Sequence, residues 1–342
     1  MRLFPQRSAR SRTAAKARTA VLGALSAVVV AIPLSATPAG AAGAAGAAEP
    51  TSDAGTTAAT ARLNGHWGPF TRCPVDNPAM RAADGRTVIA TCVSSQSPSG
   101  SIKLGKTAAH TGANDLQFGV LQNTELHTFT VVPPAGGAIV GAPTEIPGGL
   151  LGIACPADLP VITAICKLLT DNSLNRVTAT VESAGTPTGF NLAAGLSSGK
   201  PIVNVPVRIR LQNPLLGSQC YIGSAADPIV LKPQNTTNPT LAVQRFDGDG
   251  TPNTAGAMLR FALSGNSQGD SGFAVPKANG CGLLGILNGA IDLKVGLPSP
   301  AGTNNLVLNN ASTYSAGLAA PGLVRPDNGK ILSQYWHSAV LP

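Results

Sequence analysis

Charged and aromatic residues are scarce in this chain of 342 residues. Only 12% of the residues are charged and 4% are aromatic, whereas about a quarter of the residues of a typical soluble protein are charged. A surface built mainly from uncharged polar residues exerts little electrostatic steering on a partner. The low aromatic content also argues against an aromatic-rich surface for binding sugars.

The basic excess is concentrated at the N-terminus. Six of the 24 Lys and Arg residues lie within residues 1–18, followed by an apolar run over 20–34 and the small-residue sequence Ala39-Gly40-Ala41. This order is typical of a secretory signal peptide, so residues 1–41 are predicted to be removed and the protein to be extracellular. The remaining 18 basic and 16 acidic residues give a net charge of +2. That balance favours neither a nucleic-acid partner nor an anionic membrane.

The six cysteines include no Cys-x-x-Cys pair, which argues against zinc binding. An even number of cysteines in an exported chain is typical of a disulfide framework, although sequence alone leaves the pairing open. Proximity along the chain favours three pairs: Cys73–Cys92, Cys155–Cys166 and Cys220–Cys281.

Residues 42–62 are rich in Ala, Gly and Thr and have no apolar period, which predicts a flexible linker. Residues 63–342 are long enough for one disulfide-stabilised domain. The pentapeptide Gly-Leu-Leu-Gly-Ile occurs at 149–153 and again at 282–286. This echo leaves open a division into two subdomains near residue 200.

Short segments of alternating apolar and polar residues recur through this domain. In the clearest, Ile202–Asn213, valine, isoleucine and leucine occupy every second position, and Pro206 on the polar phase predicts an edge strand. Further strands are predicted at 87–93, 127–132, 176–182, 228–231, 241–246, 259–263 and 305–309. So many strands with few helices predict a mainly β protein, an antiparallel β-sandwich or barrel.

One long apolar segment, GGLLGIACPADLPVITAICKLLTD at 148–171, does not alternate. Asp158 is suited to cap a helix and Pro160 to its first turn, so a buried helix is predicted over 158–171. A membrane span is the alternative, but the uninterrupted helical part is shorter than the roughly 20 residues required. A second short helix is predicted over 283–291.

The sequence SGNSQGDSGF at 264–273 contains two patterns of nucleophilic serines. Ser267 fits the Gly-x-Ser-x-Gly elbow, but the glycines and proline that follow do not allow the helix which that motif requires. Gln268-Gly-Asp-Ser-Gly272 resembles the nucleophile motif of chymotrypsin-like serine proteases, and Thr107-Ala-Ala-His110 resembles their base motif. The resemblance implies Ser271 as nucleophile and His110 as base. The residues that flank both motifs depart from the family, and a loop of Gly, Ser and Asn between two strands is the competing interpretation.

A second polar loop, Asp247-Gly-Asp-Gly-Thr-Pro-Asn253, offers oxygen ligands for calcium. Asp247, Asp249 and Asn253 stand at alternate positions, but the bidentate Glu of an EF-hand is missing, because Met258 occupies its place. Asp-Gly turns also join the strands of hairpins, so a simple hairpin loop is the alternative.

The two tryptophans stand beside histidines near the two ends of the chain, as His66-Trp67 and Trp336-His337. A ligand platform of stacked rings is one interpretation. Packing of the two chain ends in a common core is the other, and we expect the latter.

Several segments, CPVDNPAM (73–80), SPSGSIKLG (97–105), VRIRLQNPLLGSQCYIG (207–223) and LVLNNASTY (306–314), resemble secreted proteins of filamentous actinobacteria whose function is unassigned. The resemblance implies an extracellular location and a shared fold, and it brings no catalytic residues with it. The sequence therefore favours a secreted, non-catalytic interaction or structural protein with an extracellular or cell-surface partner and no resident cofactor. A serine hydrolase that uses Ser271 and His110 is the first alternative, and a calcium-stabilised adhesion domain is the second.

Overall fold

A computed structural model describes residues 61–154, 172–319 and 326–342, and these belong to one compact unit. The first strands are β1 (Val88–Ser97), β2 (Ser99–Leu104), β3 (Thr107–Thr111), β4 (Asn114–Asn123), β5 (Thr128–Val132), β6 (Ile139–Gly141), β7 (Thr144–Glu145) and β8 (Thr178–Ser183). The later strands are β9 (Val205–Gln212), β10 (Tyr221–Ile222), β11 (Ile229–Leu231), β12 (Gln234–Asn235), β13 (Thr240–Phe246), β14 (Met258–Asp270), β15 (Ala278–Asn279) and β16 (Asn305–Ala319).

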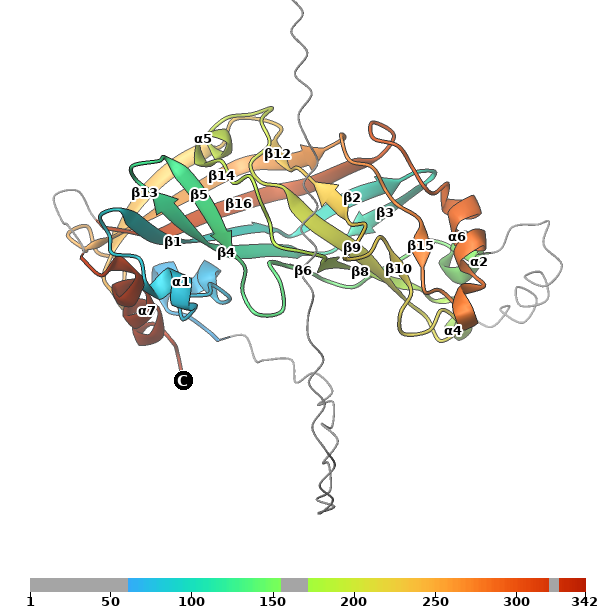
Figure 1. Cartoon of the computed structure of the whole chain (residues 1–342), viewed down its shortest axis with the longest axis horizontal. Helices are drawn as coiled ribbons and strands as arrows, with labels where there is room; N and C mark the ends of the chain where they lie inside the picture. The colour runs from blue at the N-terminus through green and yellow to red at the C-terminus, as the bar shows by residue number, and fades with distance from the viewer. Residues whose placement is uncertain (1–60, 155–171, 320–325) are drawn as a thin grey trace, which may run out of the picture. The chain divides into compact units, whose positions relative to one another are not determined.

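Helices are short and lie mainly at the ends of the sheet (Figure 1). They are α1 (Pro78–Arg81), α2 (Gly149–Ala154), α4 (Asn172–Asn175), α5 (Leu192–Gly195), α6 (Asn288–Val295) and α7 (Asn328–Ser338), with 3₁₀ turns η1 (Gly65–Phe70) and η2 (Leu283–Gly285). Within the described ranges, none of them combines the length and the apolar character that a membrane span needs.

The sixteen strands form one sheet, whose main path runs β12-β14-β16-β1-β4-β6-β8-β9-β10-β15. Neighbouring strands pair in antiparallel fashion, and the long strands β16, β1 and β4 lie side by side (Figure 1). Side chains from β1, β4, β9, β11, β14 and β16 line a common cavity, so the sheet curls round a shared interior. The predicted mainly β, antiparallel class is confirmed, and the strands form one curled sheet rather than two separately bonded sheets. Strands from both sides of residue 200 pair directly, as β8 does with β9.

The alternating pattern of Ile202–Asn213 forms β9, as predicted. Val205, Val207, Ile209 and Leu211 are buried and the intervening residues through Arg210 are partly exposed. The predicted edge position was wrong, because β9 pairs with β8 on one side and with β10 and β11 on the other. Pro206 lies just beyond the last residue pair with β8, where its carbonyl still accepts a hydrogen bond from the amide of Ala184. The missing N–H is therefore tolerated without an open edge.

The interior of the curled sheet, which we call the sheet core, is mainly aliphatic. Its buried residues include Val205, Val207, Ile209, Ile229 and Leu306. The disulfide Cys220–Cys281 is part of this core and joins the segment before β10 to the turn after β15. It confirms one of the predicted pairs.

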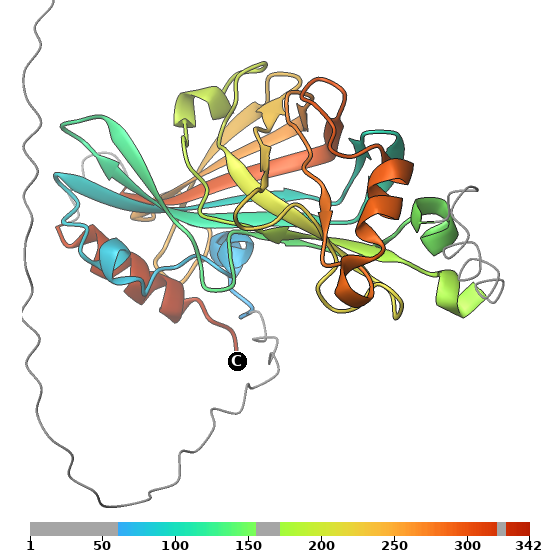
Figure 2. The same ribbon diagram turned by 45° about the vertical axis from the view of Figure 1, so that its right-hand side comes forward.

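A second core, which we call the terminal core, forms where the two ends of the described chain meet. Leu63 pairs with Val340, and the indole Nε1 of Trp336 donates to the carbonyl of Phe70 at 2.8 Å. Trp67 is fully buried and packs edge to face against Phe70 and Phe246. The expectation of core packing where the chain ends meet is confirmed for the two tryptophans, of which Trp67 is buried and Trp336 partly buried, whereas the side chain of His337 is exposed. Figure 2 shows α7 lying against the first residues of this unit.

The disulfide Cys73–Cys92 belongs to the terminal core and confirms a second predicted pair. The third predicted pair, Cys155–Cys166, lies outside the described residues, as do the predicted helix at 158–171, the predicted signal peptide and nearly all of the predicted linker. The helix predicted over 283–291 is displaced, because Gly285 and the exposed Leu284 both take positive φ angles. The chain there forms the turn η2, and the helix α6 begins only at Asn288.

Candidate functional site

The segment that carries the serine motif is strand rather than loop. β14 continues through Asp270, and two register shifts against β16, between Leu263 and Asn266 and between Asn266 and Gln268, absorb the irregular residues. Since the chain stays extended after Ser267, the strand-to-helix elbow is not formed. The expected loop of Gly, Ser and Asn is thus corrected to a bulged strand.

At the end of β14, Asp270 is buried and hydrogen-bonded to the backbone, whereas Ser271 is exposed. Asp270 is buried, and its carboxylate accepts hydrogen bonds from the backbone amides of Lys232 at 2.6 Å and Gly272 at 2.7 Å. Ser271 is exposed. The acidic residue of the motif therefore fixes the chain between β11 and β12 to the end of β14.

His110 does not lie beside Ser271. Asp270 pairs with Leu306 of β16, Leu306 pairs with Ile102 of β2, and Ile102 pairs with Ala109 of β3. Two strands therefore separate the backbones that precede the two residues, a spacing of roughly 14 Å along the sheet. A general base must approach its nucleophile to about 3 Å. The two residues that the motifs nominate are not brought together as a catalytic pair.

The predicted calcium loop connects β13 to β14, and its polar groups bond to one another. The Asn253 side chain accepts through Oδ1 from the amide of Ala255, which turns its Nδ2 toward both carboxylate oxygens of Asp247, at 3.0 and 2.9 Å. Asp249 accepts from the amide of Thr251. Asn253 thus presents a donor to Asp247, whereas a calcium ligand would present an oxygen. Among the described residues, no three His, Cys, Asp or Glu side chains gather as a metal site.

A buried amide network joins β14 to the segment that carries α5. We call this segment, residues 190–202, the strap. Asn235 accepts through Oδ1 from Asn266 at 2.7 Å and from Gln268 at 3.3 Å. Its Nδ2 donates to the strap carbonyls of Gly195 and Ser197 at 2.8 and 3.1 Å. Buried amides satisfied in this way hold the strap in one position over the sheet.

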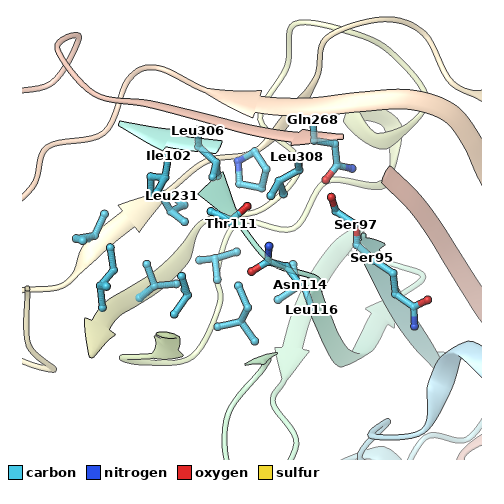
Figure 3. Close-up of a pocket in the computed structure, with 18 residues that line it drawn as sticks. Ser95, Ser97, Ile102, Thr111, Asn114, Leu116, Leu231, Gln268, Leu306 and Leu308 are labelled. Carbon is cyan, nitrogen blue, oxygen red and sulfur yellow. The ribbon is translucent and has the colours of Figure 1, made fainter. Parts of the chain in front are cut away.

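One cavity, which we call the sheet cavity, lies inside the curled sheet. Figure 3 shows Ile102, Leu231 and Leu306 in its apolar part and the hydroxyl and carboxamide groups of Ser97 and Gln268 in its polar part. The hydroxyl of Thr111 is buried there and has no hydrogen-bond partner within the described residues. The volume is about 50 Å³, well below the roughly 150 Å³ of a cavity that holds benzene. This cavity is suited to water and too small for most organic ligands.

Another cavity, which we call the strap cavity, lies between the strap and one face of the sheet. Its volume is about 170 Å³. Phe190, at the start of the strap, packs edge to face against Phe118 and Phe129 of the sheet. Leu192 and Leu196 of the strap line the cavity and are 42% and 48% exposed, so the cavity reaches the surface.

Sequence reasoning missed the strap cavity because its walls come from distant segments. Its lining extends from Thr91 to Leu318 and involves six strands, β1, β4, β5, β13, β14 and β16, together with the strap. The usable signal was compositional: the strap has Phe190, Leu192, Leu196 and Ile202 in a segment without strand alternation. Such a segment indicates apolar cover over a neighbouring element.

Comparisons of the chain with protein-family models, with curated proteins and with solved structures find no match.

Proposed function

We propose that this chain is a secreted, non-catalytic binding protein that acts outside the cell through an interaction surface on its β-rich domain. Two observations support an oxidising extracellular setting: the disulfides Cys73–Cys92 and Cys220–Cys281, and the signal-like sequence of residues 1–41.

The observation that carries the proposal is the use of polar groups as scaffold. Asp270 accepts hydrogen bonds from two backbone amides, and the side chains of Asn235, Asn266 and Gln268 are hydrogen-bonded to one another. Polar side chains that are engaged in this way position backbone and do not activate a nucleophile. At the same time, leucine side chains that line the strap cavity are exposed at its mouth, which is typical of a binding surface.

A fluorophosphonate probe that reacts covalently with activated serines tests this proposal. We expect no labelling of the folded, oxidised wild-type protein, because a serine hydroxyl needs a neighbouring base to react. The Ser271→Ala and Ser267→Ala variants are the matched controls. Labelling of the wild type that disappears only in Ser271→Ala would contradict the proposal and support the serine hydrolase alternative.

A further inference from the structure

The strap cavity has a polar floor that crosses three neighbouring strands. Thr91 of β1 is paired with Val120 of β4, and Val93 of β1 is paired with Ser315 of β16. Because residues two apart face the same side of a sheet, Thr91 and Ser315 lie on one face as diagonal neighbours. Gln122 of β4, two residues beyond Val120, lies on the same face.

These three polar side chains, Thr91, Gln122 and Ser315, all line the cavity. None of them forms a side-chain hydrogen bond with another residue in the part of the chain that the structure describes, unlike the amides of the neighbouring Asn235 network. Their hydroxyl and carboxamide groups are therefore available to a guest molecule.

Apart from Thr313 and Tyr314, the walls and roof of the cavity are apolar. The sheet contributes Phe129, Leu241, Phe261 and Leu263, and the strap contributes Phe190, Leu192, Leu196 and Ile202. The described lining contains no Lys, Arg, Asp, Glu or His. A charged group that entered would lose its hydration and find no counter-ion, so the site discriminates against ions.

We infer that the strap cavity is a ligand site for an uncharged molecule with an aromatic or short aliphatic body and a hydroxyl group. The body fills the space between the strap and the sheet, and the hydroxyl bonds to the floor formed by Thr91, Gln122 and Ser315. A volume of about 170 Å³ exceeds the roughly 150 Å³ of a leucine-lined and phenylalanine-lined cavity that binds benzene. The inference deepens the proposed binding function and rests on it.

Gly195 provides the means to block the cavity. It lines the cavity from the strap, and a Cβ placed on it would meet only Leu263 Cδ1, at 3.8 Å. A leucine at this position therefore starts at ordinary contact distance and extends into the empty space. Gly289 on α6 is the matched control, because it does not line the cavity and a Cβ there meets nothing within 4 Å.

The experiment is calorimetric titration of the oxidised full-length domain with benzyl alcohol, benzylammonium and benzoate. We expect saturable binding of benzyl alcohol and at least about tenfold weaker binding of the two ions. Gly195→Leu should weaken benzyl alcohol binding by at least about tenfold, whereas Gly289→Leu should leave it unchanged. No binding to the folded wild type, or equal binding to both leucine variants, would overturn the inference.

A second variant tests the polar floor. Thr91→Val keeps the shape of the side chain and removes its hydroxyl, so we expect it to weaken benzyl alcohol several-fold and to leave toluene unchanged. Equal effects on both ligands would contradict the role of the floor. Labelling with the fluorophosphonate probe separates the two proposals. If the probe labels Ser271 and the wild type still binds benzyl alcohol, only the proposed non-catalytic function is overturned. If the probe labels no serine and the wild type does not bind benzyl alcohol, only this inference is overturned.

Discussion

The terminal core and the sheet core are built from different side chains. The terminal core has Trp67, Phe70, Phe246 and Met80 fully buried, although aromatic residues make up only 4% of the chain. The sheet core is mainly valine, isoleucine and leucine, and both the sheet cavity and the strap cavity border it. Large rings fill space and bury much area per residue, whereas short branched side chains on a curled sheet leave gaps between its walls. The chain thus places both tryptophans where its ends meet, whereas the strap cavity beside the sheet core is lined by the smaller rings of Phe129, Phe190 and Phe261.

Among the changes that distinguish the two cores, truncation of Phe246 in the terminal core should have the largest effect on stability. This ring is fully buried between His66 and Trp67, with ring centroids 5.6 and 5.3 Å away. We expect Phe246→Ala to lower the free energy of unfolding by about 3–5 kcal/mol, because the surrounding rings cannot collapse into the space. Urea unfolding measures the loss.

The control for that truncation is Leu284→Ala, at a side chain that is 96% exposed. It should change the free energy of unfolding by no more than about 0.5 kcal/mol. A loss of similar size in Phe246→Ala and Leu284→Ala would mean that the terminal core does not stabilise the fold as described.

Removing each disulfide in turn compares the two cores directly, because loss of the sheet-core disulfide should lower the free energy of unfolding more than loss of the terminal-core disulfide. Cys220–Cys281 spans 61 residues and Cys73–Cys92 spans 19. Loop-closure entropy in the unfolded chain predicts a loss of about 4 kcal/mol for the first and about 3 kcal/mol for the second. Paired Cys→Ala variants, compared by denaturant unfolding, measure the difference. The reverse order would show that strain or residual structure outweighs loop length.

The smallest effect concerns Asp76, which contacts α7 at the rim of the terminal core. Partial burial alone would raise the pKa of Asp76, but hydrogen bonds from His337 and Ser333 outweigh it and lower the pKa below its usual value. The ionised carboxylate therefore stabilises the fold above about pH 4, and this contribution is lost as the pH falls through the lowered pKa. Both Asp76 and His337 are more than half exposed, so the contribution should stay below about 1 kcal/mol.

The measurement is thermal unfolding between pH 2 and pH 7 of the wild type and Asp76→Asn. The variant should show a shallower decline of melting temperature below about pH 4. Identical profiles would show that the Asp76 contacts do not couple to folding.

Local patterns in the sequence were sufficient to predict strands that have one buried and one exposed face. β9 follows the alternation of Val205, Val207, Ile209 and Leu211 residue by residue. The same reasoning predicted too short a strand for β14, because Gly, Ser and Asn are typical of loops and only the pairing with β16 keeps them extended. The helix α7 was missed although Ile331, Leu332, Tyr335 and Trp336 recur at helical spacing. It packs against α1 and β1.

Whether the candidate site residues lie close together could not be predicted from local sequence patterns, because it depends on the order of the strands in the sheet. Ser271 and His110 occur in the order of a known motif pair, but β16 and β2 are inserted between them by a sheet order that no tetrapeptide encodes. The nearest-neighbour rule for cysteines was adequate at Cys73–Cys92 and Cys220–Cys281. The apolar composition of the strap is visible in the sequence, but the polar floor of the strap cavity could not be predicted, because Thr91, Gln122 and Ser315 are brought together only when the sheet is complete.

The pairing of β1 with β16 also sets the time at which the fold can form. Cys92 lies opposite Ala316, and Leu63 lies opposite Val340. A ribosome releases the N-terminal strand first, so β1 has only β4 beside it until almost the whole chain has been synthesised. Contacts between residues this far apart make folding slow and place it after synthesis. A chain with this topology cannot complete its sheet until β16 has been synthesised.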